Sequence, residues 1–323
     1  MPGSSTSSFT CAEDYQAELS DVFAAFVVAN PAAFTARATR TTLLQLRLLH
    51  AQESLPRVAY VSLPPDRVFI SFSSDPALSL VWRGLALEPG EIMLHGRGER
   101  LHQRTVGPSC WGVIALSAAA LTAYSKIETG RALAPPLSGW ILRPSPRDWK
   151  RLLRVHREAA RLADTRPRIL GHPAVVPAME DELAGALVAC LTDSEARPET
   201  DAEQRAGEIL VRFEELLAAN PDRTLHLADV CDRLGVSDRS FRELCLACLG
   251  VSALKYMQLR RLTLVRAAIL RAGSDKVAVA ELARLAGFTK HSRFAAHYRA
   301  AFGETPFTTL RRATKIFVAA QNA

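Results

Sequence analysis

The feature that most constrains this chain is one residue pattern that occurs twice between Leu227 and Arg312. In each copy an amphipathic run ends at a glycine, Gly235 or Gly287, and a second amphipathic run follows after a Ser or Thr. A short helix, a turn that contains Gly and a second helix form a helix-turn-helix unit, whose second helix enters the major groove of DNA. One such pattern is a weak signal, but two copies joined by a helical segment predict a pair of DNA-reading units.

The positive charge of the chain is concentrated in the same region. Residues 221–323 contain 17 Lys and Arg against 8 Asp and Glu, whereas residues 1–220 contain 23 against 25, so the net charge of +7 comes from the final third. Clustered basic charge is typical of a domain that binds a polyanion. The alternative is a solvated basic surface without a partner. Together with the repeat, the charge favours double-stranded DNA as the partner.

The second helix of the first unit has two distinct faces. The apolar residues of 238–249 recur at helical spacing and must face the core. The opposite face presents Arg239, Arg242 and Glu243. Because arginine can bond the O6 and N7 atoms of guanine together and a carboxylate can accept from cytosine, we expect these three residues to read bases. Ser237 is expected to cap this helix and to contact the DNA backbone. The alternative is a solvated helix face with no reading role.

The second unit offers a less polar reading face, on which Ala295 and Ala296 lie beside His291 and Ser292. We expect His291 and Ser292 to contact bases, but with less discrimination than the first unit, because the alanines can only touch a thymine methyl group. Phosphate contacts position a protein without specifying sequence. The residues expected to make them are Lys290, Arg293 and Arg299.

Caps and helix lengths set the spacing of the two units. Residues 252–272 are expected to form one helix, capped by Ser252 and ended by Gly273. Its length of roughly 28 Å at about 1.5 Å per residue is close to the roughly 34 Å repeat of B-DNA, which would suit successive major grooves. Thr289 is expected to cap the second reading helix, and Thr305 the last helix, which starts at Pro306.

The amino-terminal half has a different residue pattern. From residue 34 to about 116, short apolar or alternating runs are separated by Pro, Gly and Asp. Such runs predict a small antiparallel barrel or sandwich, and a small barrel can hold one ligand. The expected strands are Leu43–Leu49, Val58–Leu63, Val68–Phe72, Leu78–Trp82, Ile92–His95 and Trp111–Leu116. The expected helices are 117–127, 148–163, 175–191 and 201–220. Residues 1–10 are expected to be a disordered tail, and 13–29 a helix or an irregular lead-in.

The fold expected for the whole chain is α+β, with an antiparallel β-barrel to about residue 128, flanking helices at 145–191 and an all-α carboxyl-terminal domain. Residues 1–190 are expected to form an effector-sensing and dimerisation domain, and 203–323 the DNA-binding domain with its two helix-turn-helix motifs joined by a long helix. The polar segment 191–202, with a proline and no periodicity, is expected to be the linker.

The carboxyl-terminal region resembles the AraC/XylS family of bacterial transcription regulators over about residues 205–315. The motifs that carry this resemblance are Gly235-Val-Ser-Asp-Arg-Ser-Phe-Arg, Gly250-Val-Ser, Tyr256, Arg260-Arg-Leu, Gly287-Phe-Thr-Lys-His-Ser-Arg-Phe-Ala, Tyr298-Arg and Phe302-Gly-Glu-Thr-Pro. The resemblance implies a regulator that binds promoter DNA and usually activates RNA polymerase. The chain has Ala253 where the family usually has proline, and the alanines at 295 and 296 weaken the expected base specificity of the second unit.

The amino-terminal half is similar to the cupin-like effector domains of that family, and in particular to the ethanolamine-operon regulator subgroup. The residues concerned are Arg97-Gly, His102-Gln-Arg, Gly107-Pro and Trp111-Gly. This implies a cupin-like barrel for an unknown small-molecule effector. Four residues are expected to line its pocket: Trp82, Arg83, Arg97 and Trp111. Buried tryptophans are more often core residues than ligand contacts, and that alternative stays open.

Two rival functions are set against a DNA-binding regulator. His95 and His102 would be the metal ligands of a cupin-type enzyme fused to a basic domain, but the close His-x-His pair of such enzymes is missing. Cys231, Cys245 and Cys248 would serve a thiol-based redox regulator, although buried cysteine usually packs as a small hydrophobe. We expect no enzyme activity, no cofactor and no metal. We expect a cytoplasmic, nucleoid-associated bacterial protein with no membrane span, RNA polymerase as a partner, and a homodimer as one assembly.

Overall fold

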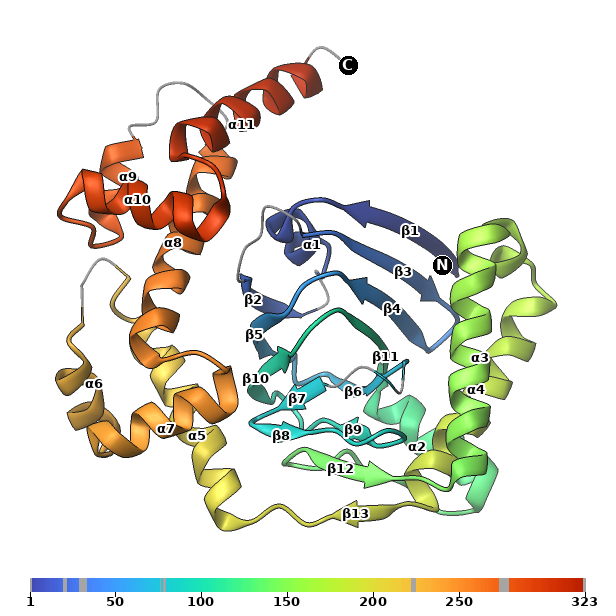
Figure 1. The fold of residues 1–323 in the computed structure, drawn as a ribbon. Helices are drawn as coiled ribbons and strands as arrows, with labels where there is room; N and C mark the ends of the chain where they lie inside the picture. The colour runs from blue at the N-terminus through green and yellow to red at the C-terminus, as the bar shows by residue number, and fades with distance from the viewer. Residues whose placement is uncertain are drawn as a thin grey trace.

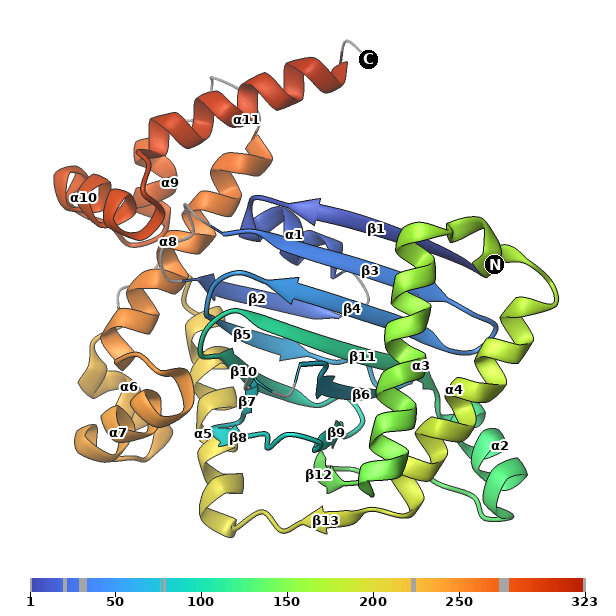
Figure 2. The same cartoon turned by 45° about the vertical axis from the view of Figure 1, so that its right-hand side comes forward.

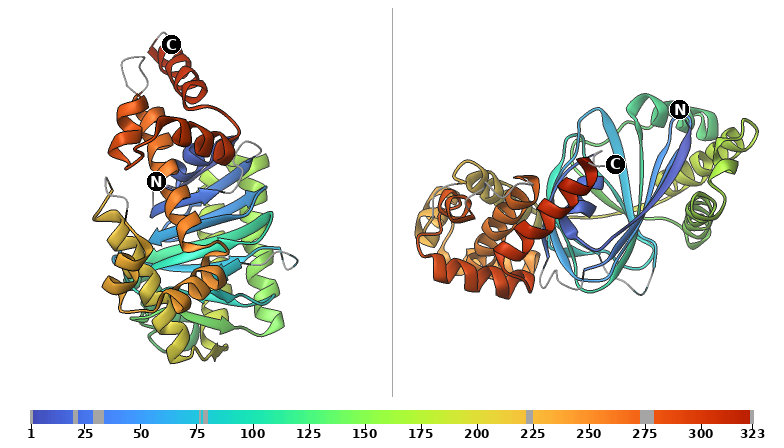
Figure 3. Two further views of the ribbon diagram at one scale, coloured as in Figure 1. Left: turned by 60° about the vertical axis from the view of Figure 1, so that its left-hand side comes forward. Right: turned by 90° about the horizontal axis from the view of Figure 1, so that it is seen from above.

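The computed structural model describes residues 2–19, 22–28, 34–75, 77, 80–221, 225–272 and 279–321. Its elements form layers in which two antiparallel sheets face each other between two groups of helices (Figures 1 and 2). One group covers the outer face of the larger sheet, and the carboxyl-terminal helices lie against the smaller sheet, as the view from above in Figure 3 shows. The α+β fold expected from the sequence is confirmed, with two facing antiparallel sheets in the amino-terminal half.

The larger sheet has the strand order β1-β3-β4-β11-β6-β9-β12-β13. Its strands are β1 (Gly3–Phe9), β3 (Ala36–Thr42), β4 (Arg47–Glu53), β11 (Ser109–Ser117), β6 (Arg67–Ser73), β9 (Ile92–Leu94), β12 (Trp140–Arg143) and β13 (Glu195–Arg197). The smaller sheet has the order β2-β5-β10-β7-β8. Its strands are β2 (Phe23–Val28), β5 (Arg57–Ser62), β10 (Arg100–Thr105), β7 (Leu80–Trp82) and β8 (Leu85–Ala86).

The helices before residue 200 belong to the amino-terminal half. They are α1 (Ala12–Glu18), α2 (Ala118–Thr129), α3 (Pro146–Thr165), the 3-10 helix η2 (Pro167–Gly171) and α4 (Val175–Thr192). The carboxyl-terminal helices are α5 (Asp201–Ala218), α6 (Leu227–Leu234), α7 (Asp238–Leu249), α8 (Ala253–Ala272), α9 (Val279–Leu285), α10 (His291–Phe302) and α11 (Pro306–Gln321). The bounds of these helices agree with the spacing of apolar residues from which helices were expected in the sequence.

Three hydrophobic clusters hold the layers together. The first lies between the two sheets and includes Phe26, Phe69 and Leu101. The second lies between the larger sheet and helices α2, α3 and α4, with Phe72 and Leu152 among its members. The third fills the carboxyl-terminal domain and also includes two residues of the smaller sheet, Val27 and Val58. The strands therefore bury both faces, because side chains alternate across a strand.

Two expectations for the amino-terminal half were wrong. Residues 1–10 are not a free tail, since β1 pairs with β3 from Gly3 to Phe9. The expected strand Leu43–Leu49 is a turn followed by the start of β4, in which the backbone N–H of Leu43 donates to the carbonyl of Leu46 at 2.9 Å. Leu43 and Leu46 are buried in this turn beneath α4, so their apolar character reflects a helix contact rather than a strand.

The segment expected to be a linker, 191–202, contains β13, which pairs with β12 at the edge of the larger sheet. Helix α5 then begins after Thr200, whose side chain and Glu203 form a capping box. Two other expected caps are present: the Ser252 hydroxyl accepts from the N–H of Lys255, and the Thr305 hydroxyl accepts from the N–H of Thr308. Gly273, expected to end α8, lies outside the described residues.

Candidate nucleic-acid interface

The first helix-turn-helix unit is formed by α6 and α7. Gly235 ends α6 with a φ of 69°, a left-handed conformation in which a side chain would be strained. Two residues later the Ser237 hydroxyl accepts from the backbone N–H of Ser240 at 3.1 Å and caps α7, as the sequence predicted. Phe241, Cys245 and Cys248 are buried along the inner face of α7. The opposite face of α7 is thereby turned to solvent.

That outer face carries the three residues expected to read bases, and all three are exposed. Arg239 is 89% exposed and its Nε lies 3.0 Å from the Glu243 carboxylate, one helical turn away. Arg242 forms an equivalent pair with Asp238 at 2.9 Å. Exposed pairs of this kind are worth little in water, so these side chains can exchange their partners for base edges at small cost.

The second unit is formed by α9 and α10 and follows the same plan. Gly287 has a φ of 78°, and Phe294 and Tyr298 are buried along the inner face of α10. The expected cap was wrong: the residue at the cap position is Lys290, and no side chain accepts from the free N–H groups there. Thr289 lies one residue too early. The uncapped, electropositive end of α10 is accordingly available to an anion.

The outer face of α10 exposes His291, Ser292, Lys290, Arg293 and Arg299. Within the part of the chain that the structure describes, no ion pair joins Lys290, Arg293 or Arg299 to an acid. The two units thus differ. The exposed arginines of α7 are paired with carboxylates on their own helix, whereas the cations of α10 are left for external anions.

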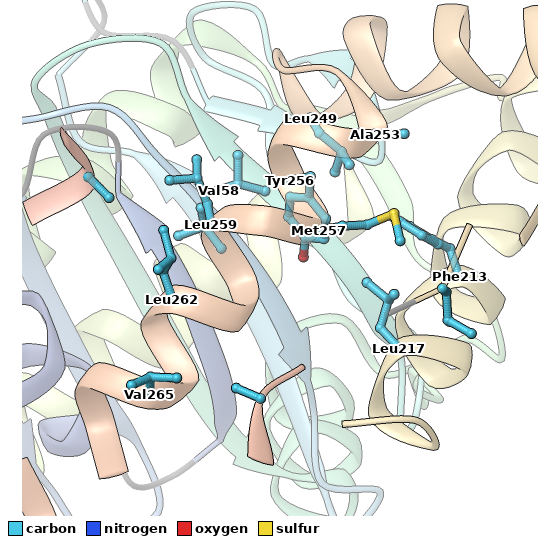
Figure 4. Packing of buried hydrophobic residues seen from close by; sticks show 14 of the residues in the cluster. Val58, Phe213, Leu217, Leu249, Ala253, Tyr256, Met257, Leu259, Leu262 and Val265 are labelled. Carbon is cyan, nitrogen blue, oxygen red and sulfur yellow. The ribbon is translucent and has the colours of Figure 1, made fainter. Parts of the chain in front are cut away.

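The long helix α8 joins the two units through one continuous core. Its 20 residues span about 30 Å at about 1.5 Å per residue. Leu249 at the end of α7 and Ala253 at the start of α8 pack in the same cluster as Leu262 and Val265 further along α8 (Figure 4). Because both units bury their inner faces in this cluster, helices α7 and α10 are held in a fixed relation to each other.

The three cysteines of this domain are buried in or beside the same cluster. Burial raises the pKa of the Cys245 thiol to about 12, and it also raises the pKa of Cys231 and Cys248. These thiols are therefore held in the protonated form that does not react as a nucleophile. Among the described residues, no group of three or more His, Cys, Asp or Glu is placed to hold a metal ion.

A cavity of about 440 Å³ lies between the two sheets of the amino-terminal half. Of the four residues expected to line an effector pocket, Trp111 alone lines this cavity. Trp82 is buried beside a smaller pocket of about 190 Å³. Arg97 is exposed and donates from Nε to the carbonyl of Pro65. The expected grouping of these four residues around one cavity is therefore corrected.

Arg83, the fourth of these residues, lies where the two halves of the chain meet. Its Nη1 is 3.8 Å from Glu99 and 3.6 Å from Glu199, and its Nη2 donates to the carbonyl of Gln204 on α5. It has a φ of 49°, an uncommon value for a residue with a side chain. A Cβ at Gly207 would lie 2.3 Å from its Nε, so α5 needs a glycine where the guanidinium passes.

Sequence reasoning missed a buried polar network between the halves. His102 Nε2 on β10 is 3.2 Å from the Tyr256 hydroxyl on α8, which donates to Glu214 on α5 at 3.0 Å. Burial favours the neutral acid, but contacts with His102 and Arg260 outweigh it and lower the pKa of Glu214. Burial and the nearby Glu214 carboxylate raise the pKa of Tyr256 well above its usual value. The only sequence signal was that Tyr256 and Arg260 belong to the motifs quoted above.

A second contact ties α8 to the amino-terminal half. Arg266 is 5% exposed, and its Nε lies 2.8 Å from Glu13 on α1. Its Nη1 donates to Glu304, just before α11, at 2.7 Å. One arginine therefore touches α1 and the second helix-turn-helix unit at the same time.

Comparison with known proteins agrees with this geometry. The family described as a helix-turn-helix domain matches residues 230–312. The chain is also 31% identical over 141 residues to the probable thc operon regulatory protein of Rhodococcus erythropolis, covering 43% of this chain and 42% of that protein. The carboxyl-terminal domain is an AraC-type domain.

A second relative matches over a shorter stretch. The XylDLEGF operon transcriptional activator of Pseudomonas putida is 31% identical over 104 residues, which are 32% of each chain. The matched regions thus span less than half the length of either curated relative.

Solved structures to which the chain is similar include that of the AraC-like transcriptional activator CuxR, with 14% identity and a TM-score of 0.42 over 87% of this chain and all of that one. A probable AraC family transcriptional regulator from Rhodopseudomonas palustris is 28% identical, with a TM-score of 0.30, over 33% of this chain and 98% of that one. Among the described helices, none combines the length and the apolar character that a bilayer span requires.

Proposed function

We propose that this chain is a sequence-specific transcription regulator of the AraC type that activates the promoters it binds. The observation that carries the proposal is the exposure of two reading helices, α7 and α10, on one core joined by α8. The net positive charge of this third of the chain supports an electrostatic attraction to DNA. The curated relatives carry the names of an operon regulatory protein and a transcriptional activator, which favours the same role.

The two units have different roles in this proposal. Arg239, Arg242 and Glu243 on α7 offer both donors and an acceptor to base edges, so the first unit specifies the sequence. The second unit anchors the protein through Lys290 and its basic neighbours, which contact phosphates, while His291 and Ser292 add base contacts of lower discrimination. Ser237 contacts the backbone from the cap of α7.

The amino-terminal half is proposed to control DNA binding through a small-molecule effector in the cavity between the sheets. Strand β10 supports this because its side chains alternate between the cavity and the AraC-type domain. Leu101 and Gln103 line the cavity. His102, between these two residues, contacts α8. Arg104, the next residue after Gln103, lies against Gly250 at the end of α7. A ligand that shifts β10 must therefore also shift contacts with the DNA-binding helices.

A chain of polar contacts offers a second connection. His95 lines the cavity, and its Nδ1 lies 3.2 Å from Glu99. Glu99 is the carboxylate that faces Arg83, which in turn donates to Gln204 on α5. Coupling between sites requires an element whose state both sites bias, and these contacts connect the cavity with α5, which packs against α6 of the first unit.

The direct test is to isolate the genomic DNA that the purified full chain binds and to measure its affinity for the recovered fragments. Wild-type protein should select discrete sites, and the double variant Arg239→Ala with Arg293→Ala should not. The matched control is Arg151→Ala, which removes an exposed arginine from α3 on the far side of the sheets (Figure 1). Selection of random fragments, or equal selection by the double variant, would contradict the proposal.

We also propose that RNA polymerase is the protein partner and that the chain forms a homodimer as one assembly. Transcription in a purified system from a recovered promoter measures activation, and sedimentation of the protein with and without that DNA measures assembly. A regulator with this function acts in the cytoplasm, on the nucleoid.

A further inference from the structure

The cavity between the two sheets is lined by basic and apolar side chains. Its volume of about 440 Å³ falls within the roughly 300–1,000 Å³ of small-molecule sites. The titratable residues among the described ones that line it are Arg40, Arg47, Arg57 and His95, with no Asp or Glu. Most of the other lining residues are apolar and come from both sheets. A cavity of this composition favours a ligand with an apolar body and an anionic group.

Arg57, on β5, is held in place by its neighbours. Its Nε lies 2.9 Å from both oxygens of Glu53, and its Nη2 donates to Gln103 at 3.2 Å. The guanidinium carbon lies 4.6 Å from the ring centre of Phe26 and 5.5 Å from that of Trp111. The side chain is 1% exposed. Because these contacts fix the guanidinium, a ligand need not order it.

One nitrogen of this guanidinium has no hydrogen-bond acceptor among the described residues. This nitrogen, Nη1 of Arg57, is buried. Glu53 is already engaged, since it accepts from Tyr15 at 2.9 Å, Ser109 at 2.9 Å and Trp111 at 3.0 Å. A buried donor without an acceptor costs free energy, and an acceptor on a ligand in the cavity would remove that cost.

Arg40, on β3, adds a second positive charge to the lining. Its Nε lies 3.5 Å from Glu18 and makes no hydrogen bond within the described part of the chain. Its side chain is 23% exposed, so its charge is incompletely screened by water. In both pairs the arginine lines the cavity, whereas Glu53 and Glu18 do not, so the charges nearest to a ligand are positive and favour an anion over a neutral acceptor.

We propose that this cavity binds a monocarboxylic acid with an apolar body, whose carboxylate accepts a hydrogen bond from Nη1 of Arg57. A carboxylate suits this position because a bond between a guanidinium and a carboxylate is charge-assisted and stronger than one to a neutral acceptor. The inference deepens the effector-binding part of the proposed function and rests on it only for the consequence in DNA binding.

The test is calorimetric titration of the full chain with two acids, decanoate and cinnamate, and with the matching alcohols, 1-decanol and cinnamyl alcohol. The acids should bind about tenfold or more tightly than their alcohols, because the alcohols lack the charge. Equal affinity for an acid and its alcohol would overturn the proposal, as would the absence of saturable binding of both acids by the folded chain.

Variants locate the site. Arg40→Gln and Gln103→Glu should each weaken the acids about tenfold and leave the alcohols almost unchanged, because one removes a positive charge and the other adds a competing carboxylate. Leu101→Trp should abolish the binding of both kinds of ligand by filling the cavity. Arg57 itself is left intact, since its loss would bury Glu53 without a cation.

The matched control is Arg37→Gln, which removes an arginine from the same strand as Arg40. Arg37 points away from the cavity, toward Asp164 on α3. This variant should bind the acids as the wild type does. Acid binding that is insensitive to Arg40→Gln and Gln103→Glu would overturn the proposal. Acid binding in the expected pattern with no change in DNA affinity would leave the ligand class standing and contradict effector control.

Discussion

The imidazole of His102 lies 3.2 Å from the hydroxyl of Tyr256, across the boundary between the sheets and the DNA-binding domain. His102 stands on β10 between two residues that line the cavity, and Tyr256 stands on the helix that joins the two helix-turn-helix units. Both side chains are buried, so the contact is shielded from water. It is a direct side-chain contact between a strand that lines the cavity and the helix that joins the two helix-turn-helix units.

Tyr256→Phe should weaken that connection. The change removes a buried hydroxyl that contacts both His102 and Glu214, and we expect it to lower the free energy of unfolding by about 1–3 kcal/mol. It should also reduce the effect of a bound carboxylic acid on DNA affinity severalfold. Urea unfolding and fluorescence anisotropy with labelled DNA measure the two effects.

The control for this variant is Tyr298→Phe. The Tyr298 hydroxyl is equally buried, but its partners Thr309 and Arg266 both belong to the carboxyl-terminal domain. This change should reduce stability while leaving the response to ligand intact. A Tyr256→Phe variant that responds to the ligand as the wild type does would show that the contact transmits nothing.

Arg239→Ala should lower DNA affinity and relax specificity at one base pair. The arginine is exposed at the start of α7, and losing a bidentate contact with a guanine should cost about 1–3 kcal/mol. Competition gel shifts with single-base variants of the site would locate the relaxed position. Unchanged affinity and specificity would remove Arg239 from the reading face.

Arg293→Ala should weaken binding to all sequences alike. The side chain is exposed on α10, and the loss of a phosphate contact should reduce the slope of log affinity against log salt by about 1. Affinity measured across a salt series gives that slope, with Arg151→Ala as the control for a lost surface charge. A loss confined to one sequence would mean that Arg293 reads a base instead.

Acid should destabilise the protein through His156. Burial is the main cause that lowers the pKa of His156 to about 3, with a smaller contribution from His50. The unfolded imidazole takes up a proton near pH 6.5, so stability is unaffected above that pH and falls as the pH drops from about 6.5 toward 3. Because of this residue, the free energy of unfolding should fall by about 2 kcal/mol between pH 6.5 and 5, at about 1.4 kcal/mol per pH unit.

His156→Leu isolates this contribution. The slope of unfolding free energy against pH should become shallower in the variant, as measured by urea unfolding at a series of pH values. His172→Leu, which removes an exposed imidazole, is the control. Equal slopes for wild type and His156→Leu would show that the buried ring is not the source of the acid sensitivity.

The two helix-turn-helix units could be predicted because their determinants are local. Gly235 and Gly287 supply positive φ values between amphipathic helices, and each signal lies within a few residues of the structure it specifies. The exposed position of Arg239 follows from the same periodicity, because the opposite face of α7 carries Phe241 and must be buried.

The strands and the cavity were less predictable because their determinants are distant. Residues 1–10 are mostly small and polar, and β1 exists because its backbone pairs with β3, from Gly3 with Thr42 to Phe9 with Ala36. Strand β10 lacks a simple alternation of apolar residues, because the buried position of His102 is occupied by a polar side chain. Its partner is the hydroxyl of Tyr256, 154 residues away in the sequence. Arg57 could not be assigned to a cavity from sequence, because its burial depends on Glu53 and Gln103.

The measurement that tests the central claim most directly is the DNA affinity of the full chain, on a fragment it selects, with and without saturating decanoate. We predict tight, sequence-selective binding that changes at least severalfold when the acid is bound, and a response that Leu101→Trp removes. Sequence-selective binding that is the same with and without the acid, in a chain that binds the acid, would contradict control of the reading helices by the cavity.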